Sequence, residues 1–159
     1  MKPFNVLFVC TDNYTRSITG EYCLKDFLKK NNINDVHVSS AGTNASSDTA
    51  TFSDTHFITM KELWIDTSTW KRTQLTDELL KKNDLVIGMA QEHYDTIAEK
   101  FGFSVKLYNE LVNGEKTSII VCSPDSKDTV EKQIRDMTKY IFDTTPILYE
   151  RIKELQKRK

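Results

Sequence analysis

The chain has 159 residues, of which 38% are hydrophobic, and its 22 basic side chains nearly balance its 23 acidic ones. This length suits a single domain over residues 1–159, and the charge balance excludes a general affinity for nucleic acid. Three cysteines are too few for a disulfide framework, which favours a reducing, cytoplasmic location. No apolar stretch approaches the length of a membrane span, so no membrane partner is expected.

Short apolar runs alternate with helical patterns along the chain. We expect strands over 5–9, 36–40, 84–89 and 104–107, and helices over 17–30, 53–63, 76–82, 91–101 and 109–113. A last helix is expected over 128–142, and Pro146 either kinks it or begins a second helix capped by Thr145. This alternation predicts a doubly wound, Rossmann-like α/β sandwich, in which helices flank a four-stranded parallel sheet.

The stretch that follows the first strand carries the chemistry. Cys10 ends the apolar run, and five residues separate it from Arg16, which Ser17 and a helical pattern follow. The N-terminus of a helix binds anions and stabilises a thiolate, and an arginine can hold two phosphate oxygens at once. The stretch predicts a site that binds an oxyanion and attacks it with sulfur. The alternative is a buried cysteine at a strand end and an arginine that is only a surface charge.

The chain resembles the low-molecular-weight protein tyrosine phosphatase family, whose relatives include phosphoarginine phosphatases and thiol-coupled arsenate reductases. The resemblance covers nearly the whole sequence. The residues that carry it are Val6-Leu7-Phe8-Val9-Cys10, Asn13, Arg16-Ser17, Glu21, Ser40-Ala41-Gly42-Thr43, Gln74-Leu75-Thr76, Asp84 to Met89, and Pro124-Asp125 before a long helix.

The resemblance implies a two-step reaction that needs no metal or cofactor. Cys10 would attack phosphorus and form a phosphocysteine, while Ser17 donates a hydrogen bond to its thiolate. Asp125 would protonate the leaving oxygen and then take a proton from water. Asn13 and Ser40 would fix the loop. The residues that bind phosphate would be Thr11, Asp12, Asn13, Tyr14, Thr15, Arg16 and Ser17.

Several residues depart from the family pattern. Asp12 stands where the family usually has glycine, and its charge should oppose phosphate unless the carboxylate points away. Thr15 replaces a second loop cysteine. The other departures are Trp70 for a histidine, Ala90 for an aspartate, and Ser126-Lys127 for a proline and an aromatic residue. Tyr14 could supply an aromatic wall for the site, and Trp70 could pack the loop or form a wall of the cleft.

The leading hypothesis is a phosphatase of protein phosphotyrosine, active as a monomer or weak dimer on phosphorylated proteins or small phosphomonoesters. Thr11 favours the alternative of a phosphoarginine phosphatase, because threonine accompanies that preference in relatives. A phospho-binding pseudophosphatase is a further alternative, and an arsenate reductase would require Cys23 or Cys122, which we otherwise expect to be small buried residues. The histidines at positions 37, 56 and 93 lack the spacing of metal ligands and are expected to be surface or helix residues.

Overall fold

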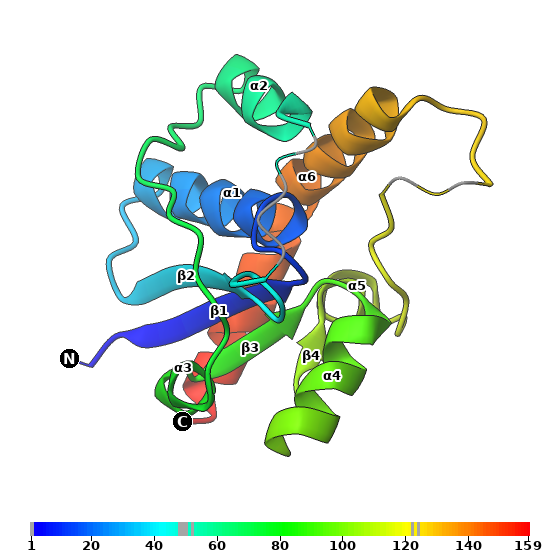
Figure 1. Ribbon diagram of the computed structural model, residues 1–159. Helices are drawn as coiled ribbons and strands as arrows, with labels where there is room; N and C mark the ends of the chain where they lie inside the picture. Colours follow the sequence, from blue (N-terminus) through cyan, green and yellow to red (C-terminus); the bar gives the residue numbers. More distant parts are fainter. Residues whose placement is uncertain (1, 48–50, 52, 122, 124) are drawn as a thin grey trace.

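The computed structural model describes residues 2–47, 51, 53–121, 123 and 125–159 (Figure 1). Its sheet has four parallel strands in the order β2-β1-β3-β4. The strands are β1 (Phe4–Cys10), β2 (Val36–Gly42), β3 (Leu85–Gly88) and β4 (Lys106–Leu107). The predicted parallel α/β fold is thus confirmed, although β4 is shorter than expected because only two of its residues pair with β3.

Helices cover both faces of the sheet, as the residues of β1 show. Side chains of a strand alternate between faces, and β1 is apolar on both. Phe4, Val6 and Phe8 pack against α1 and α6, whereas Leu7 and Val9 pack against α3 and α4. The helices are α1 (Arg16–Lys30), α2 (Thr55–Glu62), α3 (Asp77–Lys82), α4 (Gln91–Phe101), α5 (Tyr108–Asn113) and α6 (Val130–Lys157).

The last helix differs from its prediction. Helix α6 runs unbroken through Pro146, so Pro146 begins no second helix and Thr145 caps none. Proline lacks the N–H that would donate to the carbonyl of Phe142, and in the same turn Thr145 Oγ1 donates to the carbonyl of Ile141 at 2.6 Å. Leu148 and Ile152, beyond the proline, are buried in the main core. Packing against the sheet therefore stabilises the helix on both sides of the proline.

The switch point of the sheet lies at the carboxyl ends of its two central strands, β1 and β3. From β1 the chain passes through α1 to β2 on one side, and later crosses to β3 on the other side (Figure 1). Cys10 pairs with Gly42 of β2, and Val9 pairs with Gly88 of β3. Ligands of open α/β sheets bind at such a switch point, so the fold places Cys10 at the expected position for a site.

Gly42 supports the loop after β1 and tolerates no side chain. A Cβ there would lie 2.6 Å from both the Asn13 nitrogen and the Thr11 oxygen, which are backbone atoms and cannot swing aside. We expect Gly42→Ala to lower the free energy of unfolding by about 1–3 kcal/mol, measured by urea denaturation. Gly88→Ala is the matched control, since its nearest contact would be 3.6 Å. Equal unfolding midpoints for the two variants would contradict this account.

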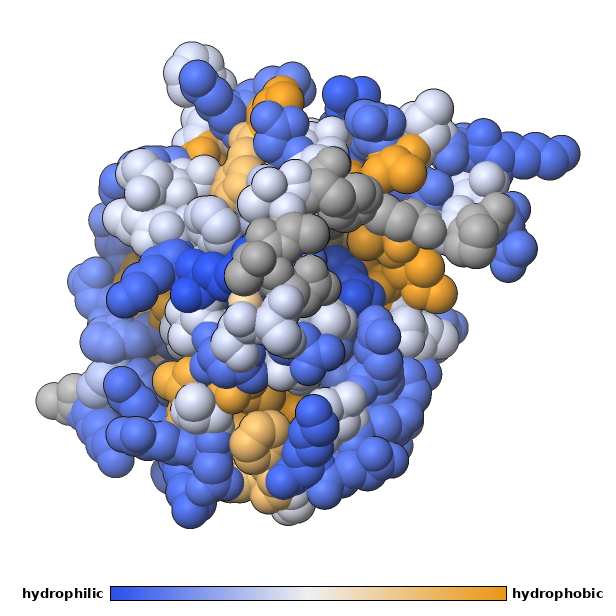
Figure 2. All heavy atoms as spheres, in the orientation of Figure 1, coloured by the Kyte–Doolittle hydropathy of each residue, from blue (hydrophilic) through white to orange (hydrophobic). Residues whose placement is uncertain are grey.

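The face of the molecule seen in Figure 2 carries mainly polar side chains, with apolar groups between them. Among the described residues, the large apolar side chains that are exposed are those of Ile58, Trp64, Ile120 and Ile147. Among the helices of the described residues, none combines the length and apolar character that a bilayer crossing requires.

Candidate active site

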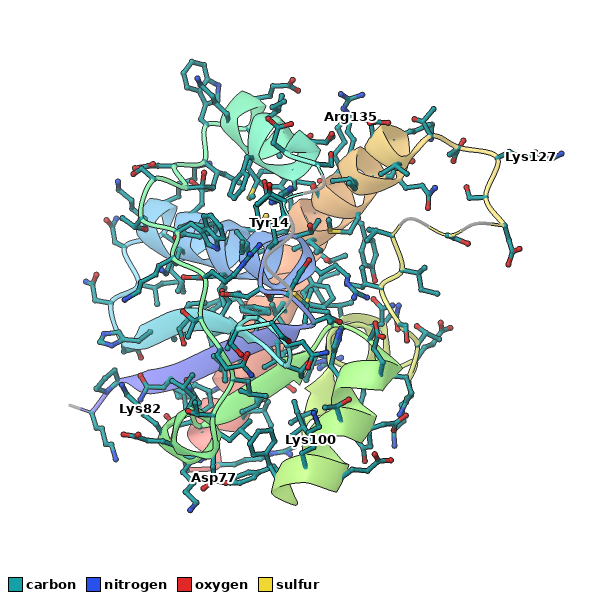
Figure 3. The ribbon with its side chains drawn as sticks, viewed as in Figure 1. Tyr14, Asp77, Lys82, Lys100, Lys127 and Arg135 are labelled. Carbon is teal, nitrogen blue, oxygen red and sulfur yellow. The ribbon has the colours of Figure 1, made fainter. Side chains whose placement is uncertain are left out.

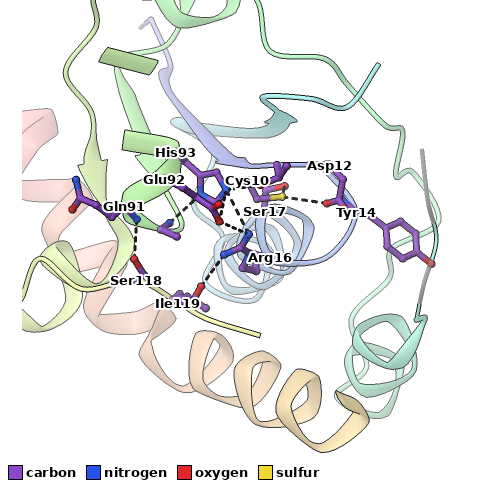
Figure 4. A network of polar contacts seen from close by, with 12 residues as sticks. Cys10, Asp12, Tyr14, Arg16, Ser17, Gln91, Glu92, His93, Ser118 and Ile119 are labelled. Atoms are coloured by element: carbon purple, nitrogen blue, oxygen red, sulfur yellow. Dashed lines mark hydrogen bonds and ion pairs between the residues drawn. The ribbon is translucent and has the colours of Figure 1, made fainter. Parts of the chain in front are cut away.

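The loop between β1 and α1, which we call the Cys10 loop (residues 10–16), forms the centre of the site (Figure 4). Cys10 is 1% exposed at the end of the strand. Within the described part of the chain, the backbone N–H groups of Thr11, Asp12, Asn13 and Thr15 donate to no other group. Free N–H groups before a helix of this length are suited to the oxygens of an anion.

A relay of side chains behind the loop fixes the environment of the sulfur. Asn13 Nδ2 donates both of its hydrogens, to Ser17 Oγ at 3.0 Å and to Ser40 Oγ at 2.9 Å. Ser40 Oγ in turn donates to Glu21 Oε1 at 2.5 Å. Ser17 Oγ lies 3.0 Å from Cys10 Sγ. Because Ser17 Oγ already accepts from Asn13, its own hydrogen is available to the sulfur and stabilises a thiolate there.

The orientation of the Asn13 amide is set by a second contact. Asn13 Oδ1 accepts the backbone N–H of Thr73 at 2.7 Å, so Nδ2 must face Ser17 and Ser40. Asn13 also has a φ of 55°, in the left-handed region that asparagine tolerates better than most residues. Backbone shape and side-chain chemistry thus both favour asparagine at this position.

Arg16 is held by groups outside its own loop. Its Nη1 donates to the Ile119 carbonyl at 2.9 Å, and its Nη2 forms an ion pair with Glu92 Oε1 at 3.1 Å (Figure 4). The Arg16 side chain is 15% exposed and that of Glu92 is 62% exposed. An exposed pair of this kind contributes little stability. An incoming phosphate can therefore displace Glu92 from Arg16 at small cost.

His93, which the sequence led us to expect as a surface or helix residue, lies in the site. It is 1% exposed at the start of α4, and its Nε2 is 3.0 Å from Thr11 Oγ1. Its Nδ1 accepts the backbone N–H of Ala90 at 3.0 Å. Burial, together with the nearby Arg16 charge, lowers the pKa of His93 to about 3, so the ring is neutral.

Asp12 has its carboxylate inside the loop. Asp12 Oδ1 accepts the N–H of Tyr14 at 3.1 Å and lies 3.8 Å from Cys10 Sγ. The described residues with positive φ other than glycine are Asn13, Asn32 and Trp64, so the backbone at Asp12 does not require glycine. The carboxylate does not point away from the nucleophile, and it opposes the binding of a phosphate in the same loop.

Tyr14 does not form a wall beside Cys10. Its side chain extends to the opposite side of the loop from Arg16 (Figure 4), is 6% exposed, and lies between α1 and α2 (Figure 3). The Tyr14 ring centroid is 5.0 to 5.6 Å from those of His56, Phe57 and Trp70, with edge-on geometry. Trp70 also donates from Nε1 to the Asn13 carbonyl at 3.3 Å. The aromatic residues near the loop therefore pack on one another and brace it.

Among the described residues, neither His56 nor Cys23 forms a hydrogen bond with Cys10 Sγ, whose partners are Asp12 and Ser17. His56 is a residue of helix α2, which agrees with the expectation of a surface or helix residue, but it is fully buried beside Tyr14, and burial lowers its pKa to about 4. Cys23 is 1% exposed in α1, as predicted, and burial raises the pKa of its thiol. A thiol in that state is unsuited to a relay with Cys10. Cys122 lies outside the described residues.

Among the described residues, Asp125 forms no hydrogen bond or ion pair with the Cys10 loop. It is exposed, in a turn where its backbone N–H approaches Ser123 Oγ at 3.4 Å. Residues 125–129, which precede α6, extend away from the sheet (Figure 1), and Lys127 projects outward (Figure 3). Within the described residues, contacts therefore join Cys10, Asn13, Ser17 and Ser40, and none joins the predicted proton donor to them.

A comparison with known families identifies this arrangement. Residues 5–158 match the sequence model of the family described as low molecular weight phosphotyrosine protein phosphatase. The chain belongs to this family. It is therefore a cysteine-based phosphatase of the low-molecular-weight class, as the sequence analysis predicted, and the residues assembled around Cys10 are its candidate active site.

Individual relatives of this phosphatase span nearly its whole length. The chain is 29% identical to a protein-arginine-phosphatase of Bacillus subtilis (strain 168), over 86% of this chain and 96% of that protein. It superposes with a TM-score of 0.80 on the arginine phosphatase YwlE, in a mutant with a phosphorylated active-site serine, at 25% identity over 94% and 96% of the chains. A low-molecular-weight protein tyrosine phosphatase from Bacillus subtilis is 29% identical, with a TM-score of 0.72 over 95% and 98%.

The phosphatase site also contains residues that sequence reasoning missed. These are His93 against Thr11, Glu92 against Arg16, Thr73 against Asn13, and Glu21 behind Ser40. Glu21 was part of the family pattern, but no role followed from its position. The sequence position of Glu92 and His93 could have indicated their role. Both lie at the start of the helix that follows β3, at the same carboxyl end of the parallel strands as Cys10.

Proposed function

We propose that this phosphatase hydrolyses phosphoarginine in proteins through a phosphocysteine intermediate. The observation that supports this choice over phosphotyrosine is the position of Tyr14, which is 6% exposed inside an aromatic cluster. A phosphotyrosine ring requires an apolar or aromatic wall beside the nucleophile, and Tyr14 is not available for that purpose. The relatives described as arginine phosphatases support the same choice.

The polar groups around the loop also suit a guanidino group. Glu92, with an exposed side chain, and Asp12, whose carboxylate lies 3.8 Å from Cys10 Sγ, are acceptors at the site. The guanidino group of phosphoarginine carries several N–H donors, whereas the ring of phosphotyrosine carries none. The carboxylates of Asp12 and Glu92 would therefore favour phosphoarginine and would discriminate weakly against phosphotyrosine.

In the proposed first step the Cys10 thiolate attacks phosphorus. An S–P bond forms, the P–N bond breaks, and the leaving guanidine nitrogen takes a proton from Asp125. The free N–H groups of the Cys10 loop and the Arg16 guanidinium hold the phosphoryl oxygens. Arg16 must exchange Glu92 for phosphate in this step, and the exposed position of that pair makes the exchange inexpensive.

In the proposed second step water attacks the phosphocysteine. The S–P bond breaks, Ser17 stabilises the departing thiolate, and Asp125 takes the proton from water. Since Asp125 is exposed in this structure, its participation requires that the segment between α5 and α6 close over the loop when substrate binds. This motion is part of the proposal.

The role of Asp125 is tested by leaving-group dependence. We expect Asp125→Asn to lower kcat by about 10²- to 10³-fold on phosphoarginine peptides, because their leaving nitrogen requires a proton. The loss on p-nitrophenyl phosphate should be much smaller, since p-nitrophenolate departs without one. Stopped-flow and steady-state assays of released phosphate measure both values.

Asp12→Asn is the matched variant, because Asp12 is the carboxylate that contacts Cys10 in this structure. If Asp125→Asn keeps its kcat while Asp12→Asn loses it selectively on phosphoarginine, the proton donor is Asp12 and the assignment of Asp125 is wrong. Loss in neither variant would indicate a reaction without a carboxylate donor.

Phosphotyrosine hydrolysis is the second candidate function, favoured by the family description and by the tyrosine phosphatase relative at 29% identity. One experiment decides between the two. Matched peptides that carry phosphoarginine or phosphotyrosine at the same position are compared by kcat/KM. We expect a preference of at least tenfold for phosphoarginine, and a preference for phosphotyrosine would overturn the proposal. Binding of both peptides with no release of phosphate would indicate a pseudophosphatase.

A further inference from the structure

We propose that His93 is a positioning residue that fixes the Thr11 hydroxyl as a hydrogen-bond donor to the phosphoryl group bound in the Cys10 loop. The two contacts of the His93 ring carry this inference, and it rests on the proposed phosphatase reaction at Cys10. His93 itself touches no substrate and acts through Thr11. Figure 4 shows His93 reaching from the start of α4 to the Cys10 loop.

The contacts of the ring determine its tautomer. His93 Nδ1 is 3.0 Å from the backbone nitrogen of Ala90, which is always a donor, so Nδ1 must accept. A neutral imidazole with an accepting Nδ1 carries its hydrogen on Nε2. The positive charge of Arg16, whose Nη2 lies 3.5 Å from Nε2, disfavours a second proton on the ring. Arg16 Nη2 is also a donor, but its contact is longer than the 3.0 Å contact of the Ala90 N–H with Nδ1, so the Ala90 contact decides the tautomer. The ring is therefore the neutral tautomer with hydrogen on Nε2.

This tautomer determines what Thr11 can do. His93 Nε2 donates to Thr11 Oγ1 over 3.0 Å, so the threonine hydroxyl is the acceptor in that bond. Its own hydrogen must point elsewhere, and among the described residues Thr11 Oγ1 has no second partner. Phosphoryl oxygens are acceptors and need donors. With the opposite tautomer the hydroxyl would donate to the ring and would be lost to the substrate.

Two substitutions separate this role from the structural role of the ring. His93→Asn can keep an acceptor for the Ala90 N–H but cannot reach Thr11, whereas His93→Gln can keep a donor near the Nε2 position but loses the Ala90 contact. We expect kcat/KM to fall about 3- to 10-fold in His93→Asn and to fall less in His93→Gln. Thermal stability should follow the reverse order, which no purely structural role would produce.

Thr11→Val closes the test as a double-mutant cycle. It removes the hydroxyl but keeps the shape, so His93→Asn should cause no further loss of kcat/KM in that background. The same loss in both backgrounds, or wild-type kcat/KM in His93→Asn, would overturn the proposal. An ¹⁵N NMR spectrum of the histidine rings gives an independent measurement, and a hydrogen on Nδ1 of His93 would also overturn it.

Failure of the proposed function is distinguishable from failure of this inference. If the wild type hydrolyses neither phosphopeptide nor p-nitrophenyl phosphate, the proposed function is wrong. The Kd for inorganic phosphate, measured by calorimetry, then serves as the readout. We expect it to rise about 3- to 10-fold in His93→Asn and less in His93→Gln. Equal Kd values in the wild type and both variants would contradict the positioning role.

Discussion

Cys10→Ser is expected to lower kcat by roughly 10⁴-fold or more, because the hydroxyl is a far weaker nucleophile than the thiolate that Ser17 and the helix N-terminus stabilise. Inorganic phosphate should still bind, since the free N–H groups and Arg16 remain in place. Steady-state release of phosphate measures the first effect, and calorimetry with phosphate measures the second.

Cys23→Ala is the matched control for this substitution. Cys23 is buried in α1 and belongs to the hydrophobic core, so its replacement should change stability more than turnover. If Cys10→Ser retained more than a hundredth of the wild-type kcat, or if Cys23→Ala abolished turnover in a protein that is still folded, the assignment of the nucleophile would be wrong.

Arg16→Lys should lower kcat by about 10²- to 10³-fold and weaken phosphate binding. Lysine keeps the charge but cannot hold two phosphoryl oxygens in one plane, and stabilisation of the oxygens in the transition state is the largest catalytic contribution at such sites. Steady-state kinetics and phosphate calorimetry measure the two losses. If the kcat of Arg16→Lys lay within fivefold of the wild-type value, a positive charge alone would be sufficient to stabilise the phosphoryl oxygens.

Glu92→Gln separates the catalytic function of Arg16 from its resting ion pair. The amide keeps the size of the side chain but removes the charge that competes with phosphate for the guanidinium. Because the pair is exposed, phosphate affinity should rise by no more than about fivefold. A fall in phosphate affinity would show instead that Glu92 orients Arg16 for binding.

The residues that the resemblance placed near Cys10 could be predicted because they are close to it in the sequence or lie on the strand that pairs with β1. Asn13 and Ser17 lie within one loop and the first turn of one helix, and Ser40 lies on the adjacent strand. Pairing of parallel strands then brings Ser40 to the loop. The strand pattern of β1, apolar on both faces, likewise predicted its central position in the sheet.

The histidines could not be placed from the sequence. A histidine at the start of a helix has the same sequence pattern whether it faces solvent or a neighbouring loop. The contact that places His93 in the site joins it to Thr11, 82 positions away in the sequence. Tyr14 is a similar case, because the cluster that encloses it includes Trp70 from an irregular segment. Periodicity gives no information on such segments.

The path of α6 was missed for a different reason. The local preference of proline predicted either a kink or the start of a second helix, and the second alternative is wrong because burial of Leu148 and Ile152 beyond Pro146 outweighs one lost hydrogen bond. The catalytic role of Asp125 is a proposal that requires a closing motion, and a turn signal in the sequence contains no information on such a motion.

The contacts that Asn13 makes with Trp70 and Thr73 span 57 and 60 positions of the sequence. During synthesis the nucleophile therefore leaves the ribosome well before the residues that brace its loop. A nascent chain that ends before Trp70 contains Cys10 and Arg16 but lacks the partner that orients the Asn13 amide. The thiol should gain its reactivity only after the centre of the protein has folded, so that alkylation of Cys10 would report complete assembly of the domain.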